Sequence, residues 1–330
     1  MSLDKQGGIS SLASNMAKIS STDLDVFPLA LGGNVFGWTA DEKRSFAVLD
    51  AYRAAGGNFI DTADLYSAWA PGNRGGESET IIGRWLAARG KREQTVLATK
   101  VGMHPQFKGL AANTIRAAAE HSLRRLGTDY IDLYYAHVDD EQTPLGETLG
   151  AFDALVREGK VRYIAASNYT APRLAEALAV SDREGLARYV ALQPHYNLME
   201  REKYEGELAD LVRRERLSSI PYFALASGFL TGKYRSDSKV ESQRAQSAGA
   251  YLNEKGIRVL GALDEVAAAH DVALATVALA WLAAQPTVVA PIASARTVEQ
   301  LPDLLRVSNL RLSDAELHKL NEASAPAKAT

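Results

Sequence analysis

The sequence predicts one (β/α)₈ barrel, and three observations support this fold class. From residue 28 onward, eight short apolar runs alternate with longer segments of helical periodicity. The runs are apolar on both faces, which is typical of parallel strands covered by helices. No Pro/Gly/Ser-rich linker divides the chain, so we expect residues 16–330 to form a single domain. An open doubly wound sheet would need a G-x-G-x-x-G turn to bind a dinucleotide, and neither Gly32-Gly33 nor Gly56-Gly57 starts one.

Each expected strand is followed by a segment with helical spacing. In the first such segment Phe46, Leu49 and Arg53 recur at helical intervals, and Gly56-Gly57 ends it. The strands are expected at residues 28–31, 58–61, 95–101, 130–137, 161–167, 189–193, 218–223 and 287–292. The seven later helices are expected at residues 77–89, 114–126, 145–158, 171–184, 204–215, 257–270 and 274–285.

Two segments do not fit the repeating unit. Residues 1–15 are polar and rich in Ser and Gly, so we expect a flexible N-terminal extension, with the fold beginning near Met16. Residues 232–249 are polar and helix-poor, and a loop of that length in a compact domain is typically a lid or disordered.

The composition excludes several classes of protein. The 330 residues are 46% apolar and 23% charged, which is ordinary for a globular protein and argues against disorder, collagen and coiled coil. The net charge of −3 gives no reason to expect nucleic acid or an anionic membrane as partner. With no cysteine there are no disulfides, thiolate zinc sites or cysteine nucleophiles. No apolar run is long enough for a signal peptide or a membrane helix, so we expect a cytoplasmic protein, and the sequence leaves its oligomeric state open.

Ionisable residues stand at the ends of three consecutive expected strands. Asp61 ends the second strand, Lys100 the third and His137 the fourth, and Tyr66 lies in the loop after the second. In a barrel, functional groups come from the carboxyl ends of the strands and the loops that follow them. Any one of these residues alone is better explained as a turn cap or a snorkelling side chain. Because buried charges are costly unless they pair, ionisable residues at the ends of three consecutive strands indicate a functional site.

These residue types suit proton delivery to a carbonyl oxygen. A phenol, with a pKa near 10, holds its proton at neutral pH, and a nearby ammonium group lowers that pKa. We expect Asp61 to pair with Lys100 and hold it against Tyr66, and His137 to donate a hydrogen bond to the substrate oxygen. The set contains no electron source, so a reductant must bind.

A second group of residues follows the later strands. Ser167 and Asn168 end the fifth strand, Gln193 ends the sixth, and Tyr222 lies near the end of the seventh. Amide side chains can bind a carboxamide, and an aromatic face can stack on a flat ring. These residues therefore predict a binding site for a planar ring that carries an amide.

Polar residues also surround a helix start after the eighth strand. Ser294, Arg296 and Gln300 combine a hydroxyl, a guanidinium and an amide with the N–H groups of a helix N-terminus, which favours a phosphate. Hydroxyl residues at a helix start are also common caps, so a purely structural role stays open.

Aromatic residues cluster in the loops after the first two strands. Phe36, Trp38 and Trp69 either form the walls of a substrate pocket or only cover the top of the barrel, and the sequence favours neither. The six histidines show no spacing that suggests a metal site.

Several longer segments together resemble one enzyme family. They are FIDTADLYS, ESETIIGRWL, VLATKVG, LRRLGTDYIDLYYAHVDD, VRYIAASNY, LQPHYNLMER, ASGFLTGKY, TVALAWLAAQP and ARTVEQL. From about residue 16 to 325 the chain resembles the aldo-keto reductases, and through GFLTGKY it looks most like bacterial members and the potassium-channel β-subunit branch. The resemblance implies a (β/α)₈ barrel that reduces small aldehydes or ketones with NADPH and no metal.

The resemblance also implies roles for individual residues. It places the catalytic tetrad on Asp61, Tyr66, Lys100 and His137, with Tyr66 as proton donor. It places NADPH on Gly33, Ser167, Asn168, Gln193, Tyr222, Leu225, Ser227, Lys233, Arg244, Ser294, Arg296, Gln300 and Asp303. Within that set Arg296 and Gln300 would bind the 2′-phosphate, and Arg244 would close over the pyrophosphate.

Some positions depart from the family pattern. Phe223-Ala224 stands where many relatives carry Ser-Pro, and Ala293-Ser294 stands where Pro-Gly is usual. Leu304 replaces a common adenine-contacting Asn, and Gly33 replaces a frequent Thr. These departures bear on cofactor affinity and leave the tetrad intact.

Two other functions are compatible with these residues. One is a nucleotide-binding redox sensor or regulatory subunit with little turnover, as the channel β-subunit likeness suggests. The other is a barrel lyase in which Lys100 forms a Schiff base while Asp61 and Tyr66 move protons.

Overall fold

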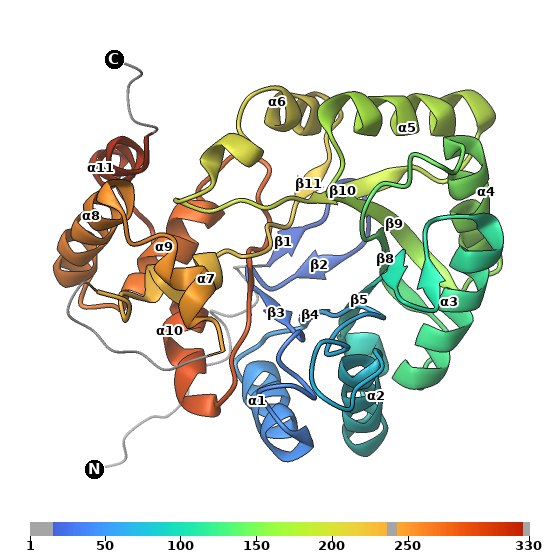
Figure 1. The fold of residues 1–330 in the computed structure, drawn as a ribbon, viewed down its shortest axis with the longest axis horizontal. Coiled ribbons are helices and arrows are strands. Elements are labelled where there is room, and N and C mark those ends of the chain that lie inside the picture. The colour runs from blue at the N-terminus through green and yellow to red at the C-terminus, as the bar shows by residue number, and fades with distance from the viewer. Residues whose placement is uncertain (1–15, 236–242, 326–330) are drawn as a thin grey trace, which may run out of the picture.

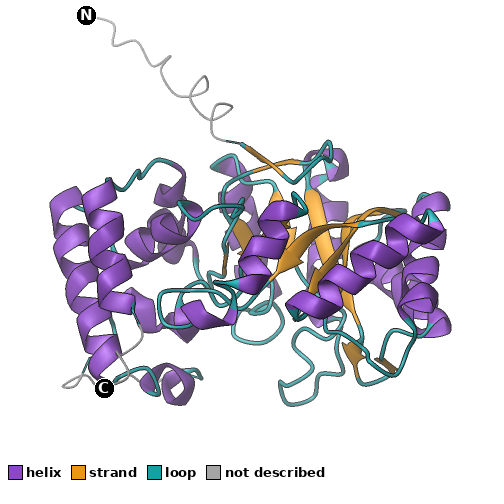
Figure 2. Ribbon diagram, turned by 90° about the horizontal axis from the view of Figure 1, so that it is seen from above, coloured by secondary structure: helices purple, strands orange, loops and turns teal. Residues whose placement is uncertain are grey.

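The computed structural model describes residues 16–235 and 243–325, and within them a parallel sheet curls into a barrel surrounded by helices (Figures 1 and 2). The sheet has eight strands in the order β11-β10-β9-β8-β5-β4-β3-β12. Their bounds are β3 (Ala30–Gly32), β4 (Phe59–Asp61), β5 (Val96–Val101), β8 (Ile131–Ala136), β9 (Val161–Ser167), β10 (Tyr189–Gln193), β11 (Ser218–Ser219) and β12 (Ile292–Ala293). A parallel bridge from Ser219 to Val288 closes the ring. The single-domain barrel that the sequence predicts is confirmed.

The last two strands are shorter than predicted. Only Ser218–Ser219 and Ile292–Ala293 form regular strand in place of residues 218–223 and 287–292. Pro221 and Pro291 lack the N–H group that a strand needs to continue its ladder. Their carbonyl groups still hold the barrel together, because Pro221 accepts from the N–H of Ile292 at 2.9 Å and Pro291 from that of Ala30 at 3.0 Å.

All eight predicted helical segments are present, with ends shifted by a few residues. They are α1 (Glu42–Ala54), α2 (Glu77–Arg89), α3 (Ala112–Leu126), α4 (Leu145–Arg157), α5 (Ala171–Glu184), α6 (Glu207–Arg214), α8 (Glu254–His270) and α9 (Leu274–Ala283). Helix α1 begins where the Asp41 side chain accepts from the N–H of Arg44, three residues along. It ends before Gly56, whose φ of 89° is a left-handed conformation that favours glycine.

The structure adds elements that the sequence analysis did not predict. A hairpin of β1 (Ala17–Lys18) and β2 (Asp25–Val26) lies at one end of the barrel, and a hairpin of β6 (Met103–His104) and β7 (Phe107–Lys108) lies at the other (Figure 2). Helix α11 (Asp314–Ser324) was also not predicted, whereas α10 (Leu301–Leu305) follows Gln300 and agrees with the helix start expected after the eighth strand.

Residues 232–249 were expected to be helix-poor, and their last five residues form a short helix, α7 (Ala245–Gly249). The middle of that segment, residues 236–242, lies outside the described residues. The predicted flexible extension at residues 1–15 also lies outside them.

Within the described residues, no single helix is both long and apolar enough to cross a membrane. Helices α8 and α9 pass that test only as a pair, and they are bent by 97° at their junction.

Alternation along the strands sets which side chains enter the barrel. The interior cluster contains Phe59 of β4, Ala98 of β5 and Tyr135 of β8. Because side chains two residues apart in a strand share a face, the next inward positions belong to Asp61, Lys100 and His137. The strands therefore bring the three predicted ionisable residues to one end of the barrel interior.

Candidate functional site

Lys100 is the centre of the site. Its Nζ donates to Asp61 Oδ2 at 2.7 Å, to the carbonyl oxygen of Thr62 at 2.7 Å and to the hydroxyl of Tyr66 at 2.9 Å. Lys100 and Asp61 are almost completely buried, so this ion pair is shielded from water. The predicted pairing of Asp61 with Lys100, and of Lys100 with Tyr66, is present in the geometry.

Asp61 also connects the site to the opposite side of the barrel. Its Oδ1 accepts from Nε2 of Gln193 at 2.9 Å, and its Oδ2 lies 3.5 Å from the hydroxyl of Tyr66. Both oxygens of the carboxylate thus have protein donors, as a buried charge requires.

The pKa of Tyr66 does not shift in the direction expected from the sequence. Burial, followed by the negative charge of Asp61, raises the pKa of Tyr66 well above its usual value. The expected lowering by Lys100 is therefore outweighed. Burial also lowers the pKa of Lys100, although Asp61 opposes that shift. Tyr66 consequently holds its proton firmly in the free site.

His137 is held as a neutral ring. Burial, and then the charge of Lys100, lowers the pKa of His137 well below its ordinary value. Its ring centroid lies 6.0 Å from that of Tyr66, at an interplanar angle of 74°. Among the described residues no group hydrogen-bonds to its Nδ1. A neutral imidazole carries one donor and one acceptor nitrogen.

The predicted amide-binding residues form one hydrogen-bonded cluster. Nδ2 of Asn168 donates to the Ser167 hydroxyl at 3.1 Å and to the carbonyl of His137 at 2.9 Å, and Oδ1 of Asn168 accepts from the Tyr222 hydroxyl at 2.7 Å. The ring centroid of Tyr222 lies 5.2 Å from that of His195, at an interplanar angle of 30°, and 5.2 Å from that of Phe223. The cluster joins the ends of β8 and β9 to the loop after β11, and Asn168 also connects it to the backbone of His137.

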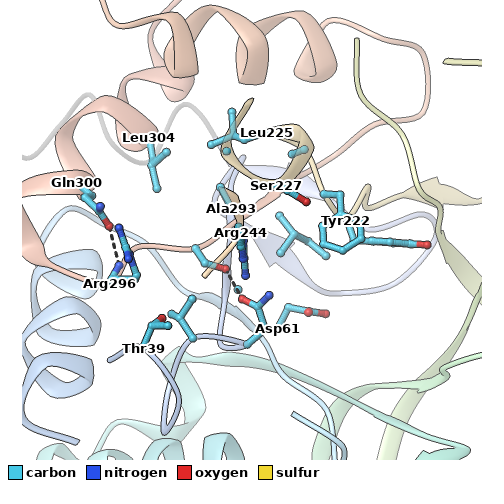
Figure 3. Close-up of a pocket in the computed structure, with 18 of the residues that line it drawn as sticks. Thr39, Asp61, Tyr222, Leu225, Ser227, Arg244, Ala293, Arg296, Gln300 and Leu304 are labelled. Atoms are coloured by element: carbon cyan, nitrogen blue, oxygen red, sulfur yellow. Dashed lines mark hydrogen bonds between the residues drawn. The ribbon is translucent and has the colours of Figure 1, made fainter. Parts of the chain in front are cut away.

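A cavity of about 630 Å³ joins these groups (Figure 3). It contains most of the predicted side chains. Those that line it are Asp61, Tyr66, His137, Ser167, Asn168, Gln193, Tyr222, Leu225, Ser227, Lys233, Arg244, Ser294, Arg296, Gln300 and Asp303, together with Trp38 and Trp69. Lys100 lies beneath the wall and reaches the cavity through Tyr66.

Besides Lys100, two predicted residues do not line the cavity, one expected in the substrate pocket and one at the cofactor. Phe36 is completely buried in the hydrophobic core, so it cannot form a pocket wall. Gly33 packs elsewhere: a Cβ atom at this position would lie 2.8 Å from Oγ of Ser78. Its neighbour Gly32 lines the cavity instead.

The cavity lining contains the guanidinium groups of Arg296 and Arg244 and the carboxylates of Glu299 and Asp303. Figure 3 shows Arg296 and Gln300 together at the far end of the cavity, where the backbone N–H of Arg296 donates to Oε1 of Gln300 at 2.8 Å. Burial, and then the charge of Arg296, lowers the pKa of Arg244. Two guanidinium groups that repel each other across a cavity suit an anion between them.

The loop after β11 has an unusual backbone. Phe223, Ala226 and Ser227 adopt φ angles of 53°, 48° and 57°, a left-handed conformation that is costly for residues other than glycine. The carbonyl of Phe223 is held by Nδ2 of Asn197 at 2.9 Å. Such strain concentrates at functional sites, and this loop forms a wall of the cavity.

Sequence reasoning missed several residues that line the cavity. Met103 and Leu65 lie in it as apolar side chains, and Asn34 accepts from the Ser294 hydroxyl at 2.7 Å. Met103 stands three residues after Lys100, so its place just beyond a strand end was the available signal. No group of three His, Asp or Glu residues suited to a metal ion occurs in residues 16–235 or 243–325.

Comparison with known proteins identifies the relatives of this chain. The model of the aldo/keto reductase family matches residues 28–325. An uncharacterized oxidoreductase of Bacillus subtilis, YrpG, is 37% identical over 314 residues, which cover 92% of this chain and 94% of the relative. The norsolorinic acid reductase of Emericella nidulans is 34% identical, covering 90% and 78%. A probable voltage-gated potassium channel subunit beta of Oryza sativa is 33% identical, covering 87% and 89%.

Proposed function

The chain belongs to the aldo/keto reductase family, and from that premise we propose that it reduces aldehyde or ketone groups of small molecules to alcohols with NADPH. The observation that carries this proposal is the position of Tyr66. Its hydroxyl lies at the cavity wall and accepts a hydrogen bond from the buried ammonium of Lys100 at 2.9 Å. A protonated phenol beside a fixed cation is suited to give its proton to an oxygen that gains negative charge.

Each member of the tetrad has a separate task. Tyr66 donates the proton to the substrate oxygen, and Lys100 stabilises the phenolate left behind. Asp61 keeps the ammonium of Lys100 in place, since the pair is shielded from water. The neutral ring of His137 donates a hydrogen bond to the same substrate oxygen and orients it.

The residues along the cavity fit a nicotinamide dinucleotide. Ser167, Asn168 and Gln193 would hold the carboxamide, and Tyr222, which lines the same cavity, would stack on the nicotinamide. When bound, the reduced nicotinamide supplies a hydride to the carbonyl carbon. Ser227 and Lys233 would contact the pyrophosphate, as the resemblance implies.

The preference for NADPH over NADH rests on the charged end of the cavity. Within the described part of the chain Arg296 has no ion-pair partner and lines the cavity, which leaves its guanidinium for a phosphate. Gln300 fixes the backbone of Arg296, and Arg244 adds a second cation. We assign the 2′-phosphate to Arg296 and Gln300, and a cytoplasmic location to the enzyme.

A regulatory role is the second candidate, because a channel β-subunit is among the relatives. A redox sensor would bind NADPH through the same cavity without multiple turnovers. The lyase alternative is disfavoured by geometry. Lys100 is completely buried and its Nζ already donates three hydrogen bonds, so it is not placed to attack a carbonyl.

The direct test is a screen of aldehydes and ketones that follows the loss of NADPH absorbance. The proposal expects multiple turnovers with at least some of these substrates. Tight binding of NADPH with no turnover across the panel would instead favour the sensor.

A further inference from the structure

We propose that Ser78, the second residue of α2, is a positioning residue: together with the hydroxyl of Thr62 it holds in place the backbone carbonyl that accepts from the Lys100 ammonium. This inference rests on the proposed carbonyl reduction and adds to it a residue outside the tetrad. It is carried by a series of buried hydrogen bonds that connects α2 with the carboxyl ends of β3, β4 and β5.

Lys100 depends on a backbone carbonyl as well as on side chains. Its Nζ donates to the carbonyl oxygen of Thr62 at 2.7 Å, the same distance as to Oδ2 of Asp61. An ammonium group has three protons, and Tyr66 accepts the third hydrogen bond at 2.9 Å. The first two acceptors therefore aim the third N–H at Tyr66. A shift of the Thr62 carbonyl would turn the ammonium away from the phenol that it has to stabilise.

The side chain of Thr62 points out of the barrel, toward α2. Because side chains alternate along a strand, Thr62 faces the side opposite to Asp61. Its Oγ1 lies 2.8 Å from Oγ of Ser78, and both residues are completely buried. Ser78 donates its one hydroxyl proton to the carbonyl oxygen of Gly33 at 2.8 Å, so Thr62 is the donor in the bond between the two hydroxyls. The hydrogen bonds thus run in one direction, from Thr62 to Ser78 to Gly33.

Gly33 leaves the space that Ser78 occupies. A Cβ atom at Gly33 would lie 2.8 Å from Oγ of Ser78. The N–H of Gly33 donates to the carbonyl of Asp61 at 2.8 Å, and the N–H of Thr62 donates to the carbonyl of Ala98 at 2.9 Å. Ser78 therefore joins the ends of β3 and β4 beside β5, the strand that carries Lys100.

The next residue of α2 fixes this helix to β5. Glu79 is completely buried, its Oε1 accepts from the Thr99 hydroxyl at 2.6 Å, and its Oε2 accepts from Nε of Arg125 at 2.6 Å. Thr99 directly precedes Lys100, and the two side chains lie on opposite faces of the strand. Two consecutive residues of α2 are thus bonded to the loop that accepts from the ammonium and to the strand that carries it, so the helix sets the distance between them.

The experiment measures kcat and KM for an aldehyde, and the dissociation constant of NADPH, in Ser78→Ala, Thr62→Val and Thr62→Ser. We expect Ser78→Ala and Thr62→Val to lower kcat about tenfold, the effect of one lost hydrogen bond, and to leave KM and NADPH binding unchanged. Thr62→Ser keeps the hydroxyl and should recover most of the activity that Thr62→Val loses.

The matched control is Ser45→Ala. Ser45 is as buried as Ser78, but it lies on α1 and its hydroxyl donates to the carbonyl of Asp41 at 2.7 Å, away from Lys100 and its acceptors. Ser45→Ala makes the same chemical change in the same degree of burial, and it should leave kcat unchanged.

Three results would overturn the inference. One is a wild-type kcat in Ser78→Ala or in Thr62→Val. Another is a loss in Thr62→Ser as large as that in Thr62→Val, since the hydroxyl would then not be the group that matters. The third is an equal loss in Ser45→Ala, which would show that kcat responds to any change in buried packing.

Failure of the proposed function is distinguished by a measurement that needs no turnover. If no aldehyde is reduced, urea unfolding is compared for Thr62→Val, Lys100→Met and the double variant, and for Ser45→Ala combined with Lys100→Met. If the Thr62 hydroxyl holds the carbonyl that Lys100 binds, Thr62→Val and Lys100→Met should together cost less stability than the sum of their separate losses, whereas Ser45→Ala and Lys100→Met should add. Additive losses for Thr62→Val and Lys100→Met would refute the positioning role, whatever the activity of the protein.

Discussion

Replacing Lys100 by Met tests whether the buried ion pair organises the site. The variant removes an ammonium that donates three hydrogen bonds, at 2.7, 2.7 and 2.9 Å, in a place closed to water. Asp61 would stay in the barrel interior with Gln193 and Tyr66 as its remaining donors. Breaking a buried pair from one side costs about 3–5 kcal/mol. We expect Lys100→Met to lower the free energy of unfolding by that amount.

The assay is urea unfolding of Lys100→Met, Asp61→Asn and the double variant, which together form a double-mutant cycle. Removing both charges takes away the uncompensated carboxylate, so the double variant should be less destabilised than the sum of the single variants by about 1–3 kcal/mol. Additive effects, or a loss below about 1 kcal/mol in Lys100→Met, would refute the reasoning that the two charges depend on each other.

Two further predictions concern Asp64, which is buried within charge range of Lys100, and Arg296, which lies at the far end of the cavity. Burial, and then the charge of Glu79, raises the pKa of Asp64 well above its usual value. The native state therefore keeps a proton that the unfolded chain releases as pH rises above about 4. Over that range Asp64 lowers the free energy of unfolding by about 1.4 kcal/mol for each pH unit, and the effect levels off at the raised pKa. In urea unfolding, Asp64→Asn should therefore have a higher free energy of unfolding than the wild type at pH 7, and the difference should shrink toward pH 4. A lower free energy of unfolding for Asp64→Asn at pH 7 would contradict this and would mean that Asp64 is ionised and paired. Arg296→Ala should weaken NADPH binding by about 10–100-fold and NADH binding much less, as measured by fluorescence titration, and equal losses would place the 2′-phosphate elsewhere.

The barrel could be predicted because the pattern of apolar residues that indicates each strand and helix lies within a short stretch of sequence. Runs such as residues 95–101 are apolar on both faces, and each is followed by helical spacing, so strand number and order follow from the pattern. The ends of the last two strands could not be predicted so well. Pro221 and Pro291 interrupt their ladders while their carbonyl groups still bridge neighbouring strands, which depends on contacts between distant segments.

The meeting of Asp61, Lys100 and His137 at one end of the barrel could be predicted for a related reason. Parallel strands end at one edge of the barrel, so Asp61, Lys100 and His137 had to meet wherever their strands were neighbours. The direction in which the pKa of Tyr66 shifts was harder to predict. The sequence suggested that Lys100 would lower the pKa of Tyr66, whereas burial and Asp61 raise it. Burial depends on the whole fold and is not visible in residue spacing.

Loop residues were the least predictable part of the site. Phe36 and Trp38 are two positions apart in one loop, yet Phe36 is completely buried in the core and Trp38 lines the cavity. Met103 was missed because no motif marks a hairpin after β5. Loop conformation depends on packing against other loops, and a periodic pattern carries no information about it.

The most direct test of the central claim is the Tyr66→Phe variant, measured by single-turnover oxidation of NADPH with an aldehyde and by NADPH titration. If Tyr66 is the proton donor, the reduction rate should fall by about 10²–10⁴-fold. NADPH binding should stay close to that of the wild type, because the proposed cofactor contacts do not include the phenol oxygen. A Tyr66→Phe enzyme that reduces aldehydes at the wild-type rate would contradict the account.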